Sequence, residues 1–238
     1  MNNNFHDFDN SYQNTGSGQL SRSEYTAKTF GWMFLGLMVT FIVSIGFYST
    51  GLVYAVFSIP MMHLFILIAE VGVVMYLSVR LHKLSIGAAR GLFFAYAALN
   101  GITFTTIFIM YDVGSIIYIF GLTSIYFGAL AAYGHFTKTD LSHIGKFLTI
   151  GLIMLVVMTI LSMFINIEMF DRVLCIIGIA IFLGYTAYDT QKIRHNYEMY
   201  SADSSMLAKA SIISALQLYL DFINLFLYLL RFLGNRKN

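Results

Sequence analysis

Three acidic residues fall inside long apolar stretches of the sequence, where a charge is hardest to place. They are Glu70, Asp189 and Asp221, whereas the other acidic residues belong to the polar stretches at the start of the chain or between the apolar runs. A charge at the middle of a membrane span costs at least about 2.5 to 3.5 kcal/mol on insertion scales, so each carboxylate needs a partner, a proton or a water-filled cavity. These residues are therefore candidates for proton or cation handling. For Glu70, a buried pair that holds two helices together is an equal alternative.

Asp221 belongs to a polar stripe with helical spacing. Six polar residues step by three or four in this part of the chain: Ser214, Gln217, Asp221, Asn224, Tyr228 and Arg231. This spacing puts all of them on one face of a helix. Because lipid satisfies no hydrogen bond, we expect the other helices to surround this one and the stripe to line a cavity or meet polar groups. A structural hydrogen-bond network without transport is the alternative.

Asp189 lies in the stretch GYTAYDTQKIRH, directly after an apolar run. Lys192, three residues on, could neutralise it in a local surface pair worth a few tenths of a kcal/mol. Asp189 is expected at the end of its span, whereas Asp221 follows Lys209 by 12 residues, about 18 Å along a helix. The two carboxylates should therefore meet only if water reaches into the bundle or the last span enters obliquely.

The elements that must position these residues are membrane-spanning helices. Hydrophobic residues make up 58% of the 238 residues and charged residues only 11%, which is typical of a polytopic membrane protein. Since a span needs about 20 apolar residues, the sequence predicts an all-α fold of seven transmembrane helices. The predicted spans are Thr29–Thr50, Phe57–Val79, Gly87–Met110, Ser115–Phe136, Phe147–Ile167, Val173–Thr190 and Ala210–Leu233.

The chain divides into three expected parts. Residues 1–27 should be a disordered polar tail, residues 28–234 the seven-helix domain, and residues 235–238 a short basic tail. Basic residues gather in the N-terminal tail and in the second, fourth and sixth connections between the spans, which predicts a cytoplasmic N-terminus. They are Arg22, Lys28, Arg80, Lys83, Arg90, Lys138, Lys146, Lys192, Arg194 and Lys209. Arg231, Arg236 and Lys237 depart from this rule, so a re-entrant last segment is an alternative.

Several classes of function lack their sequence features. The formal net charge of +2 is too small and too scattered to predict nucleic-acid binding. The chain contains no Walker loop and no zinc-ligand spacing, so no cofactor is expected. Two intramembrane aspartates superficially resemble those of aspartyl intramembrane proteases, but Leu218, Tyr219 and Leu220 stand where that class needs Gly-x-Gly before the second aspartate. An enzyme is therefore not expected.

The two C-terminal motifs carry a family resemblance. GYTAYDTQKIRH followed by LYLDFINLFLYLLRFLG resembles the motifs of the Bax inhibitor family, and the resemblance extends over the chain from about Lys28. It implies a seven-helix bundle with a central C-terminal helix. It also implies a pH-sensitive calcium leak, in which calcium is the transported ion and not a cofactor.

The resemblance assigns roles to particular residues. It implies that Asp189 and Asp221 form a hydrogen-bonded pair that shares a proton and coordinates calcium weakly and transiently, because two carboxylates in contact do not both ionise cheaply. It also implies a basic latch at the end of the second span, for which Arg80 is the nearest match and Lys83 a substitute. Supporting polar groups are expected from a further set: Glu70, Gln217, Asn224 and Tyr228.

Two other functions remain open, and both fit a bacterial inner membrane as the expected location. One is a regulatory protein that binds and restrains a membrane-protein partner such as a membrane protease, a role that the resemblance also implies. The other is proton-coupled calcium exchange instead of a passive leak. The expected partners are thus the lipid bilayer, calcium and protons, with a membrane protein as a further possibility.

Overall fold

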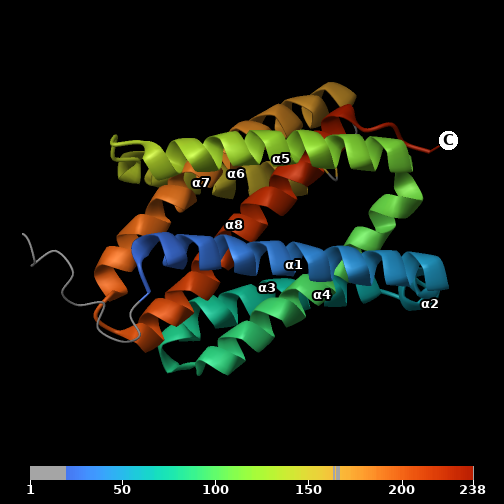
Figure 1. Cartoon of the computed structure of the whole chain (residues 1–238). Coiled ribbons are helices and arrows are strands. Elements are labelled where there is room, and N and C mark those ends of the chain that lie inside the picture. Colours follow the sequence, from blue (N-terminus) through green and yellow to red (C-terminus); the bar gives the residue numbers. More distant parts are fainter. Residues whose placement is uncertain (1–19, 163, 165–166, 238) are drawn as a thin grey trace, which may run out of the picture.

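The computed structural model describes residues 20–162, 164 and 167–237 and shows an all-helical chain (Figure 1). The helices are α1 (Arg22–Thr50), α2 (Leu52–Phe57), α3 (Met62–Arg80), the 3₁₀ turn η1 (Leu81–Lys83), α4 (Ile86–Met110), α5 (Val113–Phe136), α6 (Ser142–Ser162), α7 (Glu168–Tyr200) and α8 (Ser204–Leu233). Within the described residues, seven of these helices are long and apolar enough to cross a membrane, α2 being too short. The predicted fold class and the number of spans are confirmed.

Helix α1 begins at Arg22, six residues before the predicted start of the domain at residue 28. Ser21 and Glu24 form a capping box, in which the Ser21 hydroxyl accepts from the Glu24 N–H and the Glu24 carboxylate accepts from the Ser21 N–H. These bonds satisfy N–H groups that have no partner within the helix. Tyr25 is fully buried against Tyr197 of α7. The rest of the predicted tail, residues 1–19, lies outside the described residues.

Two other span boundaries differ from the prediction in ways that matter for the site. The second span begins at Met62 and not at Phe57, since α2 ends there and Met61 takes a left-handed conformation with φ of 63°. The helix of the sixth span continues past the predicted end of the span at Thr190, since α7 runs to Tyr200. Hydropathy marks where a helix leaves the apolar layer, whereas hydrogen bonding continues the helix beyond it.

The helices form two groups of three with α8 crossing between them (Figure 1). Helix α4 packs against α1 and α3 in one group, and α7 packs against α5 and α6 in the other. Helix α8 contacts both groups, through α1 and α4 on one side and through α5 and α7 on the other. About two thirds of its apolar window is buried (67%), compared with 11% for α6. The last helix is thus the most buried of the seven candidate spans and α6 the least buried.

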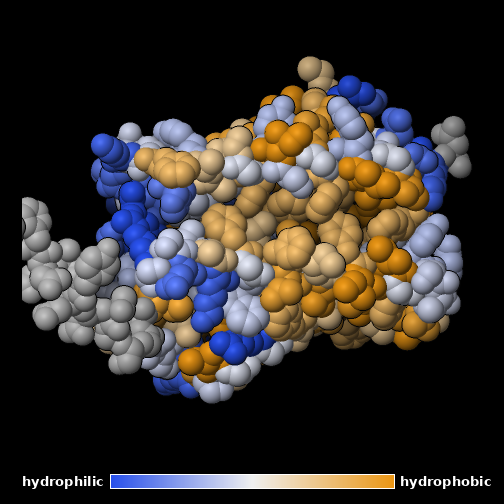
Figure 2. Space-filling view, in the orientation of Figure 1, coloured by the Kyte–Doolittle hydropathy of each residue, from blue (hydrophilic) through white to orange (hydrophobic). Residues whose placement is uncertain are grey.

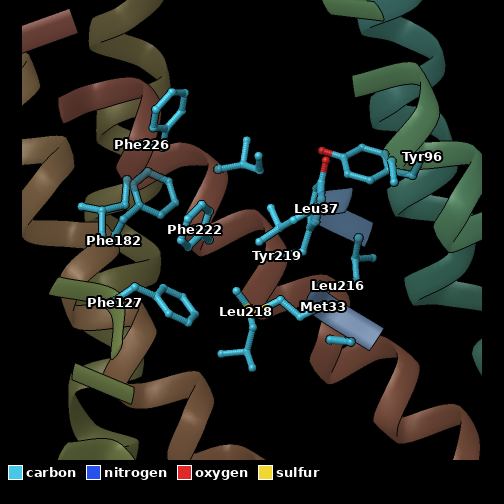
Figure 3. Close-up of a cluster of buried hydrophobic side chains, with 14 of the residues drawn as sticks. Met33, Leu37, Tyr96, Phe127, Phe182, Leu216, Leu218, Tyr219, Phe222 and Phe226 are labelled. Carbon is cyan, nitrogen blue, oxygen red and sulfur yellow. The ribbon is translucent and has the colours of Figure 1, made fainter. Parts of the chain in front are cut away.

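Aromatic side chains of α8 form much of the core (Figure 3). Phe222 meets Phe127 of α5 edge to face with 5.4 Å between ring centroids. Phe226 stacks on Phe104 of α4 at 5.8 Å. These contacts fill the space between the two groups, so α8 joins them through its large apolar side chains.

The surface reflects the membrane environment. Apolar residues cover the middle of the molecule in Figure 2, and hydrophilic residues gather at the end where α1 begins. We call this the basic end, because the ten basic residues counted above lie at the helix ends and connections that meet there. At the opposite end, residues 235–237 dock on the α4–α5 connection, where the Asp112 N–H donates to the Asn235 carbonyl at 3.0 Å and the Lys237 N–H to the Met110 carbonyl at 2.9 Å.

A buried hydroxyl pair links α1 to α8 and gives a first testable prediction. The Thr40 and Tyr219 hydroxyls lie 2.6 Å apart, and the Thr40 hydroxyl also lies 2.9 Å from the Ala97 carbonyl. Replacing Thr40 by valine would leave the fully buried Tyr219 hydroxyl without this partner. In a double-mutant cycle with Tyr219→Phe, we expect a coupling energy of about 1 kcal/mol. Unfolding of the four proteins in detergent micelles measures it, and additive effects would contradict the link.

Candidate functional site

The two candidate aspartates lie on a helical hairpin formed by α7 and α8. Only residues 201–203 separate the two helices. Asp203 begins α8 by accepting from the Ser205 N–H at 2.9 Å and the Met206 N–H at 3.0 Å, which satisfies two free N–H groups of the first turn. The short turn makes α7 and α8 antiparallel neighbours along their length.

Two side-chain contacts along this hairpin are separated by fourteen residues, which is twice seven, on both helices. The Asn196 side chain donates to the Ser214 hydroxyl at 3.0 Å. Fourteen residues back on α7 and fourteen further on α8, the rings of Phe182 and Tyr228 stack with centroids 5.9 Å apart. A seven-residue repeat keeps one seam of two packed helices in register. The register between α7 and α8 is therefore constant over this length.

Asp189 and Asp221 occupy the middle step of this repeat. Each lies seven residues from the polar contact and seven from the aromatic contact, and both side chains line the same cavity. The sequence prediction placed Asp189 at a helix end near Thr190, whereas α7 runs on to Tyr200 and places Asp189 within the hairpin, on the same cavity as Asp221.

Both carboxyl groups are buried and line one cavity. Asp189 is 6% exposed and Asp221 is 4% exposed. The cavity has a volume of ≈ 240 Å³, and its other walls come from α6, α7 and α8: Leu152, Phe182, Tyr185, Gln217, Leu220 and Asn224. Asp221 Oδ2 is buried and accepts no hydrogen bond within the described part of the chain. A buried carboxylate oxygen requires a proton donor, water or a cation, so this atom is the chemically unsatisfied point of the site.

The polar stripe predicted on the last span faces α7, as its spacing requires. Gln217, Asp221 and Asn224 line the cavity, and the Asn224 amide donates to the Leu220 carbonyl at 2.8 Å. At the far end of the stripe, Arg231 donates to Asp171 of α7 at 2.7 Å. The stripe therefore meets protein and the cavity, not lipid.

The cation nearest to the aspartates belongs to α7. The Lys192 charge acts on both Asp189 and Asp221, and its ammonium lies 5.9 Å from the centroid of the Tyr188 ring. The sequence indicates Lys192 only as a surface partner of Asp189. It lies one turn from Asp189 on the continuing α7 helix, so its charge reaches both aspartates although its side chain does not line their cavity.

Arg80 does not contact either aspartate in this structure. It ends α3 as an exposed side chain, and within residues 20–162, 164 and 167–237 it forms no ion pair. Instead, the buried Lys209 of α8 donates to the His82 carbonyl at 3.3 Å. The end of α3 is thus linked to α8 by a residue that spacing did not single out, and the latch contact expected of Arg80 is not formed.

Glu70 lies apart from the aspartates, on the other group of helices. Its carboxylate accepts from the Thr103 hydroxyl of α4 at 2.7 Å. Nearby, the Asn100 amide donates to the Tyr96 hydroxyl at 3.1 Å. The pairing of α3 with α4 that the sequence offered as one interpretation of Glu70 is therefore present.

Sequence reasoning missed four residues of the cavity wall, Leu152, Phe182, Tyr185 and Leu220. Tyr185 could have been found, since it precedes Asp189 by four residues and so shares its helix face. Leu152 comes from α6 and carries no signal in the sequence. Among the described residues, no three His, Cys, Asp or Glu side chains lie close enough together to hold a metal ion. The cavity therefore offers two carboxylates as cation ligands.

Seven helices that are long and apolar enough to cross a membrane define a multi-pass membrane protein, in which two buried carboxyl groups line a cavity between α6, α7 and α8. Residues 22–238 match the family described as "Inhibitor of apoptosis-promoting Bax1". The chain belongs to this Bax inhibitor family.

Bacterial relatives resemble the chain over nearly its whole length. The inner membrane protein YbhL of Escherichia coli K12 is 40% identical over 215 residues, which cover 90% of this chain and 92% of YbhL. An uncharacterized protein of Borreliella burgdorferi is 37% identical over 220 residues, covering 92% and 95% of the two chains. An uncharacterized protein of Rickettsia prowazekii is 35% identical over 214 residues, covering 90% of each.

Proposed function

We propose that this protein is a pH-sensitive calcium leak of a bacterial inner membrane, controlled by a proton shared between Asp189 and Asp221. The observation that carries the proposal is the buried Asp221 oxygen without a hydrogen-bond partner, on the wall of a cavity that Asp189 also lines. Two neighbouring carboxylates repel each other when both are ionised, and a shared proton removes this cost. Loss of that proton leaves charge in the cavity that a cation can balance.

Calcium suits this site as a passing ion. Calcium prefers six to eight oxygen ligands, whereas the cavity offers two carboxyl groups and the amide oxygens of Gln217 and Asn224. Water must supply the rest, so binding is weak and release is fast, as a conducting path requires. Tyr228 stacks on Phe182, which lines the cavity.

Arg80 keeps its proposed role as a latch only in a second conformation, in which the end of α3 moves toward Asp189. The bond from Lys209 to the His82 carbonyl would restrain that movement. We further propose that the basic end faces the cytoplasm, because short cytoplasmic connections carry the excess of Lys and Arg.

Calcium flux into vesicles that contain the purified protein tests the proposal. We expect the flux of the wild type to change with pH and the flux of Asp189→Asn to lose most of this dependence, because asparagine cannot exchange a proton. Asp203→Asn is the matched control, since asparagine caps a helix as well as aspartate and Asp203 lies outside the cavity. Its pH profile should match the wild type.

Other results of the same experiment would support a different mechanism or function. An unchanged pH profile in Asp189→Asn would remove the aspartate pair from the mechanism. Uphill calcium movement driven by an imposed proton gradient would identify exchange instead of a leak. Absence of flux together with a co-purifying membrane protein would favour a regulatory role.

A further inference from the structure

A second cavity opens at the basic end, outside the aspartate site. Its volume is ≈ 370 Å³, and it lies between the α5–α6 connection and the last turns of α7. Its basic lining residues are Lys138 from the connection and Lys192, Arg194 and His195 from α7. Four groups able to carry positive charge thus converge on one hollow.

The three permanently basic side chains of this cavity form no ion pair among the residues that the structure describes. In the described parts of the chain, ion pairs form between Arg22 and Glu198, Arg172 and Glu168, and Arg231 and Asp171. None of them involves Lys138, Lys192 or Arg194, the basic residues of the cavity. An anion that enters the cavity would therefore not have to break an existing ion pair.

The two carboxylates of the cavity are already engaged. Glu198 lies 4.0 Å from Arg22 of α1. Asp140 accepts from the Ser142 N–H at 2.9 Å, and the Ser142 hydroxyl and N–H hold the pKa of Asp140 below its usual range, with His143 and His195 adding to the effect. Asp140 is thus hydrogen-bonded to the start of α6. The three permanently basic side chains of the cavity outnumber its two carboxylates.

The wall formed by the connection is held in place before any ligand binds. The Gln191 side chain of α7 donates to the Thr139 carbonyl at 2.8 Å and accepts from the Leu141 N–H at 2.9 Å. These two bonds fix the connection against α7 and set the position of the backbone next to Lys138. Binding therefore pays little for ordering this segment.

We propose that this cavity binds a phosphate group, either in the headgroup of an anionic phospholipid or as free phosphate. Arginine offers a planar set of donors that matches phosphate oxygens, and lysine adds a mobile point charge. Basic pockets between membrane helices on the cytoplasmic side suit anionic lipid headgroups. This inference concerns binding alone and does not depend on calcium flux.

The surroundings of the cavity fit a lipid as the source of the phosphate. Phe136 at the end of α5 is 78% exposed and Phe147 near the start of α6 is 76% exposed. Both helices that flank the connection thus expose a large apolar side chain within a few residues of the cavity lining, Phe136 two residues before Lys138 and Phe147 five residues after Ser142. A headgroup held at the basic residues would have its acyl chains beside these rings.

Titration calorimetry on the full-length protein in a neutral detergent tests the proposal. The probes are dioctanoyl phosphatidylglycerol, dioctanoyl phosphatidylcholine and inorganic phosphate. We expect phosphatidylglycerol to bind and the double variant Lys138→Gln, Arg194→Gln to bind it at least about tenfold more weakly, since each basic group near an anionic headgroup contributes about 1 kcal/mol. The charge-matched control Lys28→Gln, Lys146→Gln changes two basic residues that do not line the cavity and should bind within about threefold of the wild type.

The three probes separate the possible sources. If phosphatidylglycerol and inorganic phosphate bind but phosphatidylcholine does not, the ligand is a phosphate group whose negative charge is not balanced by a choline group. Binding of phosphatidylglycerol alone identifies an anionic lipid. Failure of both anions to bind the wild type, or equal loss in the two double variants, would overturn the proposal. Melting temperatures of all variants close to that of the wild type establish that the loss reflects the site.

Discussion

Replacing Asp221 by asparagine should abolish the pH dependence of calcium flux, and adding Asp189→Asn should change nothing further. The reason is that the proposed switch is one proton held by two carboxyl groups. Substituting either partner removes the shared proton, so the second substitution has no switch left to remove. Residues that act as one unit give such non-additive effects. Flux measured in vesicles across a range of pH for the two single variants and the double variant gives the comparison.

The wild type and Asp203→Asn provide the reference for that comparison. Two independent titrating groups would instead produce additive changes, in which the double variant departs further from the wild type than either single variant. Such additivity would contradict the shared proton even if both aspartates affect flux. The proximity of the pair, at the middle step of the α7–α8 repeat, makes the non-additive result the expected one.

Replacing Gly134 by alanine should be among the most destabilising small changes in the protein. A Cβ at this position of α5 would overlap the backbone carbonyl group of Ala187 in α7. A backbone atom cannot rotate away, so the two helices must separate, and overpacking of this kind costs about 3 kcal/mol at the upper end of its usual range. Unfolding in detergent micelles measures the loss. The movement would also displace α7 two residues from Asp189.

Gly128→Ala is the matched control on the same helix. A Cβ there meets no atom within 4 Å, and alanine favours a helix over glycine. Its stability should equal or slightly exceed that of the wild type. Similar losses in the two variants would mean that the α5–α7 contact at Gly134 is not as close as described.

The predictability of this fold follows from the bilayer. Long apolar runs are easily recognised, because a span must bury about 20 residues in hydrocarbon, and all seven were found. The polar stripe through Asp221 was also recoverable, since its residues share one helix face and lipid cannot satisfy them. Both predictions depend on local sequence and on the solvent alone.

Features that depend on contacts between helices were not predictable in the same way. The continuation of α7 to Tyr200 follows packing against α8 beyond the apolar layer, so hydropathy placed the helix end ten residues early. Lys209 reaches the His82 carbonyl across 127 residues of sequence, and no spacing rule connects the two. The family resemblance assigns the basic latch to Arg80. Its exposed position at the end of α3 shows that a match in sequence position does not establish the contact with Asp189.

The burial of α8 has a consequence for how the protein is made. Ribosomes synthesise the other six spans before this helix, so the space between the two groups of helices is filled only when α8 has been made. Until α8 is in place, Asp189 on α7 has no carboxyl partner. The free-energy cost of placing its carboxyl group in the bilayer is then not reduced by any contact with α8. The three-residue turn lets α7 and α8 insert together as a hairpin. Assembly of the aspartate pair and completion of the bundle are thus the same event.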